Sequence, residues 1–118
     1  MFTNDEHTST ALRVYLDITE NDATIHITGD LDCYSAGGLR EALDQVAGLV
    51  TQRVQLDLHE LMFVDSRGIQ MLIEARDRAR KDSVDIRLVG PVTPIVQRVL
   101  DITGMEHELR RGEEFPTG

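Results

Sequence analysis

The stretch Leu61-Met62-Phe63-Val64-Asp65-Ser66-Arg67-Gly68-Ile69 changes character in its middle. An apolar run that is typical of a buried strand ends at Val64, and helical spacing begins at Gly68-Ile69. A strand is therefore expected to deliver Ser66 to the first turn of a helix. The first N–H groups of a helix have no partner within it, and that end favours negative charge. Such a terminus can hold a phosphate, so Ser66 is predicted to be an exposed hydroxyl that another protein phosphorylates. The alternative is that Asp65-Ser66 only caps the helix.

Two strands are predicted upstream of this stretch, because apolar and polar residues alternate there with a period of two. Between them, Glu20-Asn21-Asp22 is expected to form a hairpin turn, since Asn and Asp tolerate turn backbones. The side chains predicted to point inward are Leu12, Val14, Leu16 and Ile18 on the first strand, and Ile25 and Ile27 on the second. The second strand is expected to end at Gly29-Asp30-Leu31-Asp32.

Three helices and two further strands are predicted from the spacing of apolar residues and from residues that typically begin or end a helix. Ser35 is expected to cap the first helix, the helix after Ser66 buries Ile69 and Leu72, and Thr93-Pro94 is expected to open the last one. The basic run 76–81 is predicted to be a solvated helix face. Apolar stretches predicted to be buried are Leu39 to Val50 at helical spacing, Val54 to Leu58, Val84 to Val89, and Ile95, Val96, Val99 and Leu100 before a stop at Gly104.

The predicted order is therefore β-β-α-β-α-β-α. A β-α-β-α-β part implies parallel neighbouring strands with right-handed crossovers, and the opening hairpin adds an antiparallel pair. The sequence thus predicts one α/β domain over residues 11–110, with a mixed four- to five-stranded sheet packed with amphipathic helices. Residues 1–10 are predicted to be a flexible arm, and residues 111–118 a tail.

Composition restricts the class of protein. With 118 residues, the chain is long enough for one domain with its own core. Its 21 acidic and 12 basic residues give a formal charge of −9, which argues against a nucleic-acid partner, because phosphate binding calls for a basic patch. The single cysteine, Cys33, excludes an internal disulfide and favours the cytoplasm. No apolar run approaches the ~20 residues of a membrane span.

Several kinds of chemistry are disfavoured by the residues present. A serine hydrolase at Ser66 would want a glycine where Val64 stands, and only His107 follows as a base. An aspartyl phospho-acceptor at Asp57 or Asp65 does not resemble the response-regulator family, which places an acidic pair after its first strand and a lysine at the end of its last. The first strand here ends in Ile18-Thr19-Glu20, and the chain's one lysine is Lys81. The histidines (His7, His26, His59 and His107) are scattered without ligand spacing, so neither a metal site nor a cofactor is expected.

A set of short motifs spread over the chain resembles the STAS domain, and more closely the anti-sigma-factor antagonists. The resemblance runs from about Leu12 to Leu109. The two motifs that carry most of it are Gly29-Asp30-Leu31-Asp32 and Asp65-Ser66-Arg67-Gly68, which are fairly specific together at this spacing. The supporting segments are Ser35-Ala36, Leu39 to Leu43, Leu56-Asp57-Leu58, Leu88 to Pro91 and Val99 to Gly104.

The resemblance implies a binding module and not an enzyme. By it, Ser66 matches the serine that an anti-sigma factor with serine kinase activity phosphorylates, and a phosphatase would reverse this step. The unphosphorylated protein would bind the anti-sigma factor and free the sigma factor. The partner-binding residues it implies are Asp30, Asp32, Ser35, Asp65, Ser66, Arg67 and Gln70.

The chain departs from the family pattern at Arg67 and Gln70, where a small residue and a glycine are usual. The alternatives left open are a STAS scaffold or transporter-accessory subunit that is never phosphorylated, and a small serine hydrolase using Ser66. The protein is expected to be cytoplasmic, a monomer or weak dimer, with no direct contact to nucleic acid or membrane.

Overall fold

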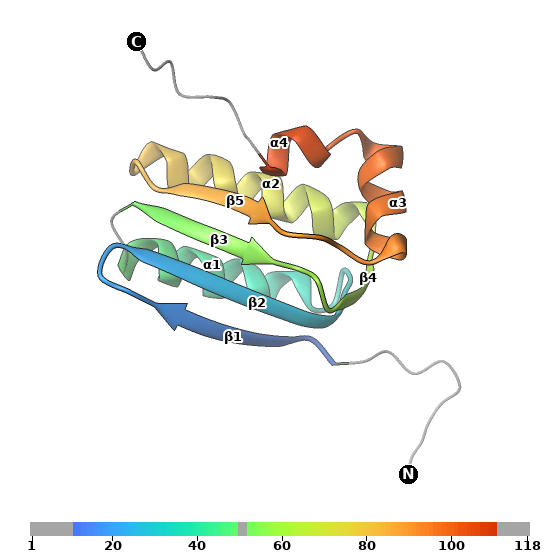
Figure 1. The fold of residues 1–118 in the computed structure, drawn as a ribbon, viewed down its shortest axis with the longest axis horizontal. Coiled ribbons are helices and arrows are strands. Elements are labelled where there is room, and N and C mark those ends of the chain that lie inside the picture. The colour runs from blue at the N-terminus through green and yellow to red at the C-terminus, as the bar shows by residue number, and fades with distance from the viewer. Residues whose placement is uncertain (1–10, 50–51, 111–118) are drawn as a thin grey trace.

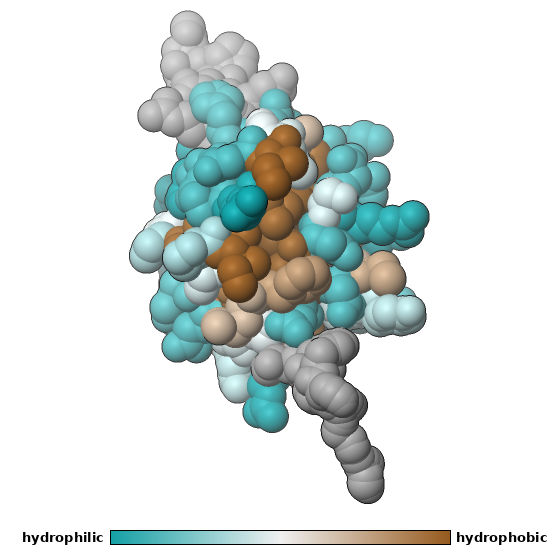
Figure 2. All heavy atoms as spheres, turned by 90° about the vertical axis from the view of Figure 1, so that its right-hand side faces the viewer, coloured by the Kyte–Doolittle hydropathy of each residue, from teal (hydrophilic) through white to brown (hydrophobic). Residues whose placement is uncertain are grey.

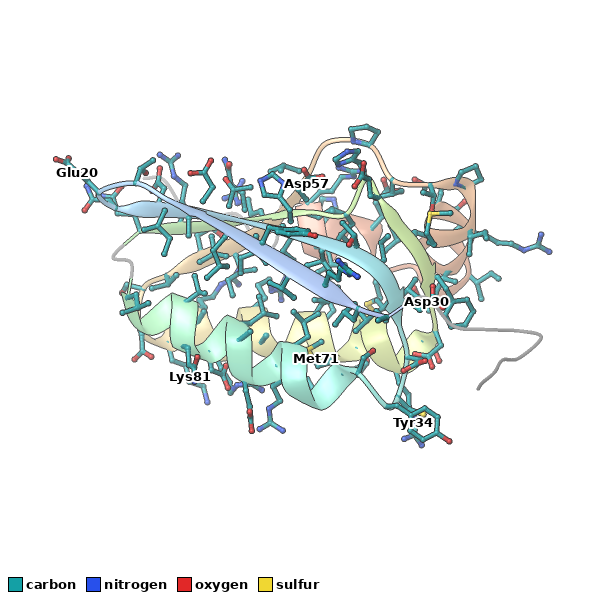
Figure 3. The ribbon with its side chains drawn as sticks, turned by 90° about the horizontal axis from the view of Figure 1, so that it is seen from below. Glu20, Asp30, Tyr34, Asp57, Met71 and Lys81 are labelled. Atoms are coloured by element: carbon teal, nitrogen blue, oxygen red, sulfur yellow. The ribbon has the colours of Figure 1, made fainter. Side chains whose placement is uncertain are left out.

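The computed structural model describes residues 11–49 and 52–110. The predicted arm (1–10), the predicted tail (111–118) and Val50, predicted to be buried, lie outside the described residues. Five strands form one mixed sheet, and the two long helices α1 and α2 cover one of its faces (Figures 1 and 3). The elements are β1 (Arg13–Ile18), β2 (Asp22–Leu31), α1 (Ala36–Leu49), β3 (Arg53–Asp57), β4 (Leu61–Val64), α2 (Ser66–Lys81), β5 (Asp85–Val89), α3 (Pro94–Thr103) and α4 (Glu106–Arg110). The predicted mixed α/β domain is confirmed.

The long strand β2 connects two parts of the sheet. Over its first part it pairs with β1 antiparallel and with β3 parallel, and β5 continues the sheet beyond β3. Its last residues pair instead with β4, after a shift in register between Gly29 and Asp30. Gly29 has φ of +90°, and a side chain there would collide with the Ala11 carbonyl. This position therefore requires glycine.

The core lies between the helices and the covered face of the sheet. Alternate residues of β2, β3 and β5 point into it, and α1 and α2 each contribute an apolar stripe, as the sequence spacing predicts. The core is aliphatic, and its largest fully buried side chains are Ile25, Ile27, Leu31, Leu39, Leu43, Leu56, Leu58, Leu61, Ile69, Leu72, Ile86 and Leu88. Figure 3 shows polar side chains on the opposite face of the sheet.

Two elements were missing from the predicted order β-β-α-β-α-β-α. Leu61–Val64 forms a strand of its own, β4, because a turn after Leu58 separates it from β3. The helix α4 follows Gly104, where the last helix was predicted to stop, and no further element was predicted there. It is too short to show a periodicity, and Leu109 anchors it by complete burial.

The helix ends on α3 follow the prediction. The Thr93 hydroxyl accepts a hydrogen bond from the Val96 N–H, Pro94 is the first helical residue, and Gly104 ends the helix in the left-handed conformation. Ile95, predicted to be buried, is half exposed instead. The α3 helix covers the end of the sheet beside β4, and its first turn leaves this side chain in solvent.

The burial predicted for β1 is wrong in its second half. Leu16 is 50% exposed and Ile18 is 47% exposed, although both lie on the same face as the half-buried Val14. The reason is that β1 is an edge strand, paired among the described residues only with β2. An edge strand has no neighbour on its outer side to complete the burial of its side chains.

The prediction that residues 76–81 are solvated is wrong for Arg76. Its side chain is only 6% exposed, and its guanidinium donates to the Glu108 carbonyl at 2.6 Å and the Glu108 carboxylate at 2.9 Å. A third contact joins it to Asp77 at 2.7 Å. Arg76 therefore ties α2 to α4. Among the described residues, no helix is long and apolar enough to cross a bilayer.

Candidate functional site

The site lies where β2 and β4 end side by side. Leu31 and Val64, the last residues of the two strands, are paired in parallel, and the Asp65 N–H donates to the Leu31 carbonyl at 3.4 Å. Because both strands run in the same direction, the residues that follow them emerge at one edge of the sheet. The loop after β2 and the start of α2, predicted to belong together, are thereby brought together.

Asp65 is the N-cap of α2, and Ser66 is its first residue. The Asp65 carboxylate accepts a hydrogen bond from the Gly68 N–H at 2.8 Å, which satisfies one of the unpaired donors of the helix start. Asp65 thus serves as the cap, and Ser66 stands exposed at the positive end of the helix.

Gly68 lets α2 approach the sheet closely. A Cβ atom at this position would lie 2.9 Å from Leu31 Cγ and 2.9 Å from Val64 Cγ2, closer than side chains pack. The absence of a side chain therefore holds the first turn of α2, and with it Ser66, directly against the ends of β2 and β4.

The loop after β2 is held by its own polar groups. The Asp32 carboxylate accepts hydrogen bonds from the Tyr34 N–H at 2.9 Å and the Ser35 N–H at 3.1 Å. The Ser35 hydroxyl accepts from the Asp32 N–H at 3.0 Å and lies 3.2 Å from the half-buried Asp30's carbonyl. The Ser35 carbonyl accepts the first α1 bond, from Leu39. These bonds fix the loop and leave Tyr34 projecting, 93% exposed.

Arg67 and Gln70 lie with Ser66 around a shallow hollow. Its volume is about 430 Å³, and its remaining walls are Ile69 of α2 with Thr103 and Met105 at the end of α3. Arg67 and Gln70 are both exposed. The two departures from the family pattern thus lie on the surface immediately next to the serine.

An apolar patch lies at the same end of the molecule. Figure 2 shows it where β4 and α3 meet, surrounded by hydrophilic side chains. The exposed large apolar residues of these elements are Met62, Phe63, Ile95 and Ile102. The Thr93 hydroxyl donates to the Leu61 carbonyl at 2.9 Å and so fastens α3 to β4. An apolar centre with a polar surround is typical of a surface that docks another protein.

No general base lies within hydrogen-bond distance of Ser66 among the described residues. His107, the base that a hydrolase would have to use, is an exposed residue of α4. The arrangement at the carboxyl ends of β2 and β4 presents a hydroxyl but shows no partner to activate it as a nucleophile.

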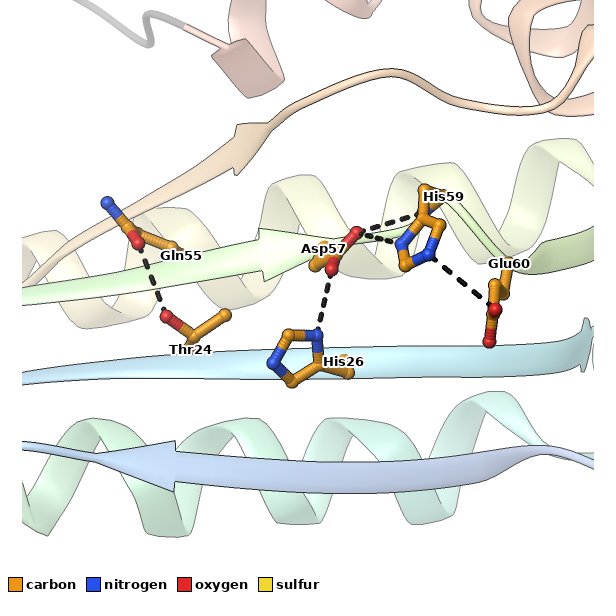
Figure 4. Close-up of polar contacts among 6 residues, drawn as sticks. All are labelled: Thr24, His26, Gln55, Asp57, His59 and Glu60. Carbon is orange, nitrogen blue, oxygen red and sulfur yellow. Dashed lines mark hydrogen bonds and ion pairs between the residues drawn. The ribbon is translucent and has the colours of Figure 1, made fainter.

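A second polar cluster on the open face of the sheet was missed in the sequence. Asp57 of β3 accepts hydrogen bonds from His26 Nδ1 at 2.8 Å and from His59 Nδ1 at 2.7 Å (Figure 4). The prediction that the histidines are scattered is therefore wrong for His26 and His59. The period-two alternation of each strand was the available signal, because it places His26 and Asp57 on the polar faces of β2 and β3. These two strands are neighbours, and His26 is paired with Asp57 in their register. Among the described residues no group of three metal-ligating side chains could hold an ion.

The contacts of this cluster shift two pKa values. Partial burial opposes ionisation of the Asp57 carboxyl, but hydrogen bonds from the His59 N–H, the His59 ring and the His26 ring outweigh it and lower the pKa. The hydrogen bond to Asp57 and the charge of Asp57 raise the pKa of His59, with a smaller contribution from Glu60.

Comparison with known proteins assigns the family. The family model described as "Mlab, STAS domain" matches residues 14–111, most of the chain, and the chain therefore belongs to the STAS domain family. Among named relatives, the anti-sigma-B factor antagonist of Bacillus subtilis (strain 168) is 29% identical over 87 residues, covering 74% of this chain and 78% of the relative. A STAS-domain containing protein of Pseudomonas aeruginosa (strain UCBPP-PA14) is 31% identical over 83 residues, which cover 70% of this chain and 80% of the relative.

Solved structures share the fold at lower identity. The anti-sigma factor antagonist SpoIIAA in its unphosphorylated form has a TM-score of 0.66 and 20% identity, over 81% of this chain and 83% of that one. An anti-sigma factor antagonist from Mycobacterium paratuberculosis has a TM-score of 0.69 and 18% identity, over 84% of this chain and 83% of that one. These matches bear out the predicted STAS fold.

Proposed function

We propose that this protein is an anti-sigma-factor antagonist, a binding module whose hold on its partner ends when Ser66 is phosphorylated. The observation that carries the proposal is the position of Ser66. It is exposed as the first residue of α2, while Asp65 provides the cap and the Asp32 loop lies on the neighbouring strand end. The relatives named as anti-sigma-B factor antagonists support the same role.

The docking surface proposed here combines the Ser66 edge with the apolar patch of β4 and α3. Met62 and Phe63 precede Ser66 by only a few residues, so a partner that covers the patch also reaches the serine. Tyr34 would add a projecting aromatic contact from the loop after β2. Asp30, Asp32, Ser35 and Asp65 shape the surroundings of Ser66 in this proposal.

The switch would work through charge and bulk at this surface. A phosphoryl group adds roughly −1.5 to −2 charge at neutral pH, and it would join the acidic groups already at this edge. Docking would then have to remove a dianion from water, which is costly unless the partner supplies a cation. Two unit charges ~6 Å apart at an effective dielectric of ~20 interact by about 3 kcal/mol, or roughly a hundredfold in affinity.

The fold need not change for this switch to operate. The start of α2 carries free N–H groups and a positive dipole end, both of which tolerate a phosphate. Arg67 stands next to Ser66 and could pair with the phosphate, which would blunt the repulsion. Replacing it by serine is then expected to widen the difference between the two forms.

The proposal implies an anti-sigma factor with serine kinase activity as partner, a phosphatase that removes the phosphate, and a place in the cytoplasm. The test titrates wild-type, Ser66→Ala and Ser66→Glu protein calorimetrically against each candidate anti-sigma kinase of the source organism. We expect Ser66→Ala to bind like the unphosphorylated protein and Ser66→Glu to bind about ten- to a hundredfold more weakly. Equal affinities of the two variants would refute the switch.

Ser83 offers a matched control, because it lies just beyond the opposite end of α2 and is also exposed. Ser83→Glu adds the same charge far from the proposed surface and is expected to leave the affinity unchanged. Intact-mass measurement after incubation with ATP and each kinase is expected to show one added phosphate in wild-type protein and none in Ser66→Ala.

A STAS scaffold or transporter-accessory subunit that is never phosphorylated is the second candidate. The same fold, at a TM-score of 0.60 and 18% identity, occurs in the murine anion transporter Slc26a9, where the match covers 14% of that chain. Arg67 and Gln70 beside Ser66 also favour this candidate, since both change the surface that a kinase would meet. Unmodified Ser66 together with retained binding by Ser66→Glu would support it. Serine hydrolysis is tested separately by an ester-cleavage assay.

A further inference from the structure

Strand β1 carries apolar side chains that the other described residues leave exposed. Tyr15 is 53% exposed, Leu16 is 50% exposed and Ile18 is 47% exposed. Among the described residues β1 pairs only with β2, and its register with β2 is unbroken from Arg13 to Ile18. The edge has no proline and no bulge, and its two charged side chains, Arg13 and Asp17, are of opposite sign.

The backbone groups on this edge are set by the hairpin. The Thr19 N–H donates to the Asp22 carbonyl at 2.8 Å, so these two residues form a hydrogen-bonded pair. In an antiparallel pair, hydrogen-bonded and non-hydrogen-bonded positions alternate. The N–H and C=O groups of Val14, Leu16 and Ile18 therefore point away from β2, toward the free edge.

The side chains of β1 are complementary to a second copy of themselves. In an antiparallel pairing centred on Tyr15, Val14 faces Leu16 of the other copy, so the outward backbone groups meet in hydrogen-bonded pairs. Arg13 then faces Asp17, twice by symmetry, on the open face of the sheet. Leu12 faces Ile18 on the helix face. Each charge meets its opposite, and each aliphatic side chain meets another.

We propose that two copies of this chain associate through β1, antiparallel and centred on Tyr15, to form one sheet continuous through both. The pairing would cover Leu16 and Ile18, which the described part of a single chain leaves half exposed. It does not rest on the proposed function, because β1 lies along the side of the sheet and the Ser66 edge at the end of β2 and β4 (Figure 1).

A charge swap tests the register. Sedimentation velocity in reducing buffer, over a range of concentrations, compares wild type with Arg13→Asp, Asp17→Arg and the double variant. We expect a wild-type dimer, a dissociation constant raised about tenfold or more by each single change, and recovery in the double variant. Within one chain Arg13 faces Thr28 and Asp17 faces Thr24, so recovery requires contact between copies.

A cysteine pair provides a second, independent readout. In a Cys33→Ser background, Tyr15→Cys puts two thiols opposite each other at a non-hydrogen-bonded pair, a separation that suits a disulfide. It is expected to form an oxidised dimer, whereas Asp17→Cys, which faces Arg13, is not. Circular dichroism confirms that each variant is folded. A wild-type protein that stays monomeric at its highest reachable concentration, or a dimer unaffected by the charge reversals, would overturn the proposal.

Discussion

The carboxylate of Asp65 accepts the Gly68 N–H at 2.8 Å and thereby caps α2 in place of its neighbour Ser66. A serine at the start of a helix is commonly used as a cap itself. Here the adjacent aspartate takes that task, and the serine is left exposed. Asp65 therefore has the structural role of capping the helix, and the Ser66 hydroxyl is left available for modification.

This division predicts distinct effects of changes at Asp65. Asp65→Ala removes the cap and is expected to lower the free energy of unfolding by about 1 kcal/mol. Asp65→Ser keeps an oxygen that can accept the Gly68 N–H, so the free energy of unfolding is expected to fall by only a few tenths of a kcal/mol, on the order of 0.3 kcal/mol. Urea unfolding followed by circular dichroism measures both. A serine variant as unstable as the alanine variant would contradict the capping role.

Gly68→Ala is expected to destabilise the protein even though alanine favours helices. The added Cβ would meet Leu31 and Val64 at 2.9 Å, and crowding of this kind costs about 1–3 kcal/mol. Gly38 in the first turn of α1 is the matched control, because nothing lies within 4 Å of a Cβ built there. Gly38→Ala is expected to be neutral or stabilising by up to about 1 kcal/mol. Equal effects of the two changes on the urea midpoint would rule out the close approach.

Arg76→Met is expected to loosen α4 from α2. The change removes the donor that holds the Glu108 carbonyl and carboxylate, and we expect a loss of about 1–3 kcal/mol. Arg78→Met is the control on the same helix, since its ion pair with Asp44 at 3.2 Å is partly exposed and surface pairs contribute about 0–1 kcal/mol. Thermal unfolding and hydrogen exchange of the α4 amides report the difference. Comparable losses in both variants would argue against a special role of Arg76.

The Asp57 cluster predicts a pH dependence. His59 has a raised pKa, so the stability from its contact with Asp57 is fully present below about pH 6.5 and is lost as pH rises through the folded-state pKa. Asp57 has a lowered pKa, so its contribution is present above about pH 3.9 and is lost as pH falls through the folded-state value. The contact is thus most stabilising between these limits.

Nuclear magnetic resonance titration of the His59 ring checks this assignment. Asp57→Asn is expected to bring the pKa of His59 down toward its ordinary value, because Asp57 provides both the hydrogen bond and the main charge. Glu60→Gln, which removes a carboxylate 3.6 Å from His59 Nε2, is expected to lower it less. If Glu60→Gln lowered the pKa of His59 more than Asp57→Asn did, Glu60 and not Asp57 would be the main cause of the raised pKa.

The parts of the fold that local pattern dictates were predictable. Alternation in β2, the apolar stripe of α1, and the Thr93-Pro94 and Gly104 signals of α3 each involve residues close in sequence. The resemblance to the anti-sigma-factor antagonists implied that the Asp32 loop lies beside Ser66, and the parallel pairing of β2 with β4 is the physical reason that it does.

What escaped prediction depends on contacts between distant segments. Arg76 is buried only because Glu108, 32 residues later, comes to lie against it. The meeting of His26 with Asp57 is fixed by the register of β2 on β3, which a single strand does not encode. The exposure of Leu16 reflects the position of β1 at the edge, a property of the sheet and not of the strand.

The change of partner along β2 at Gly29 makes the protein two frameworks that share one strand. In one framework β2 pairs with β1 and β3, and in the other it pairs with β4, which leads into the helix that carries Ser66. The helix α2 packs on β5 as well as beside β4, so it contacts both frameworks. Changes confined to β4 and the loop after β2 would therefore alter the surface around Ser66 while leaving the pairing of β2 with β1 and β3 in place.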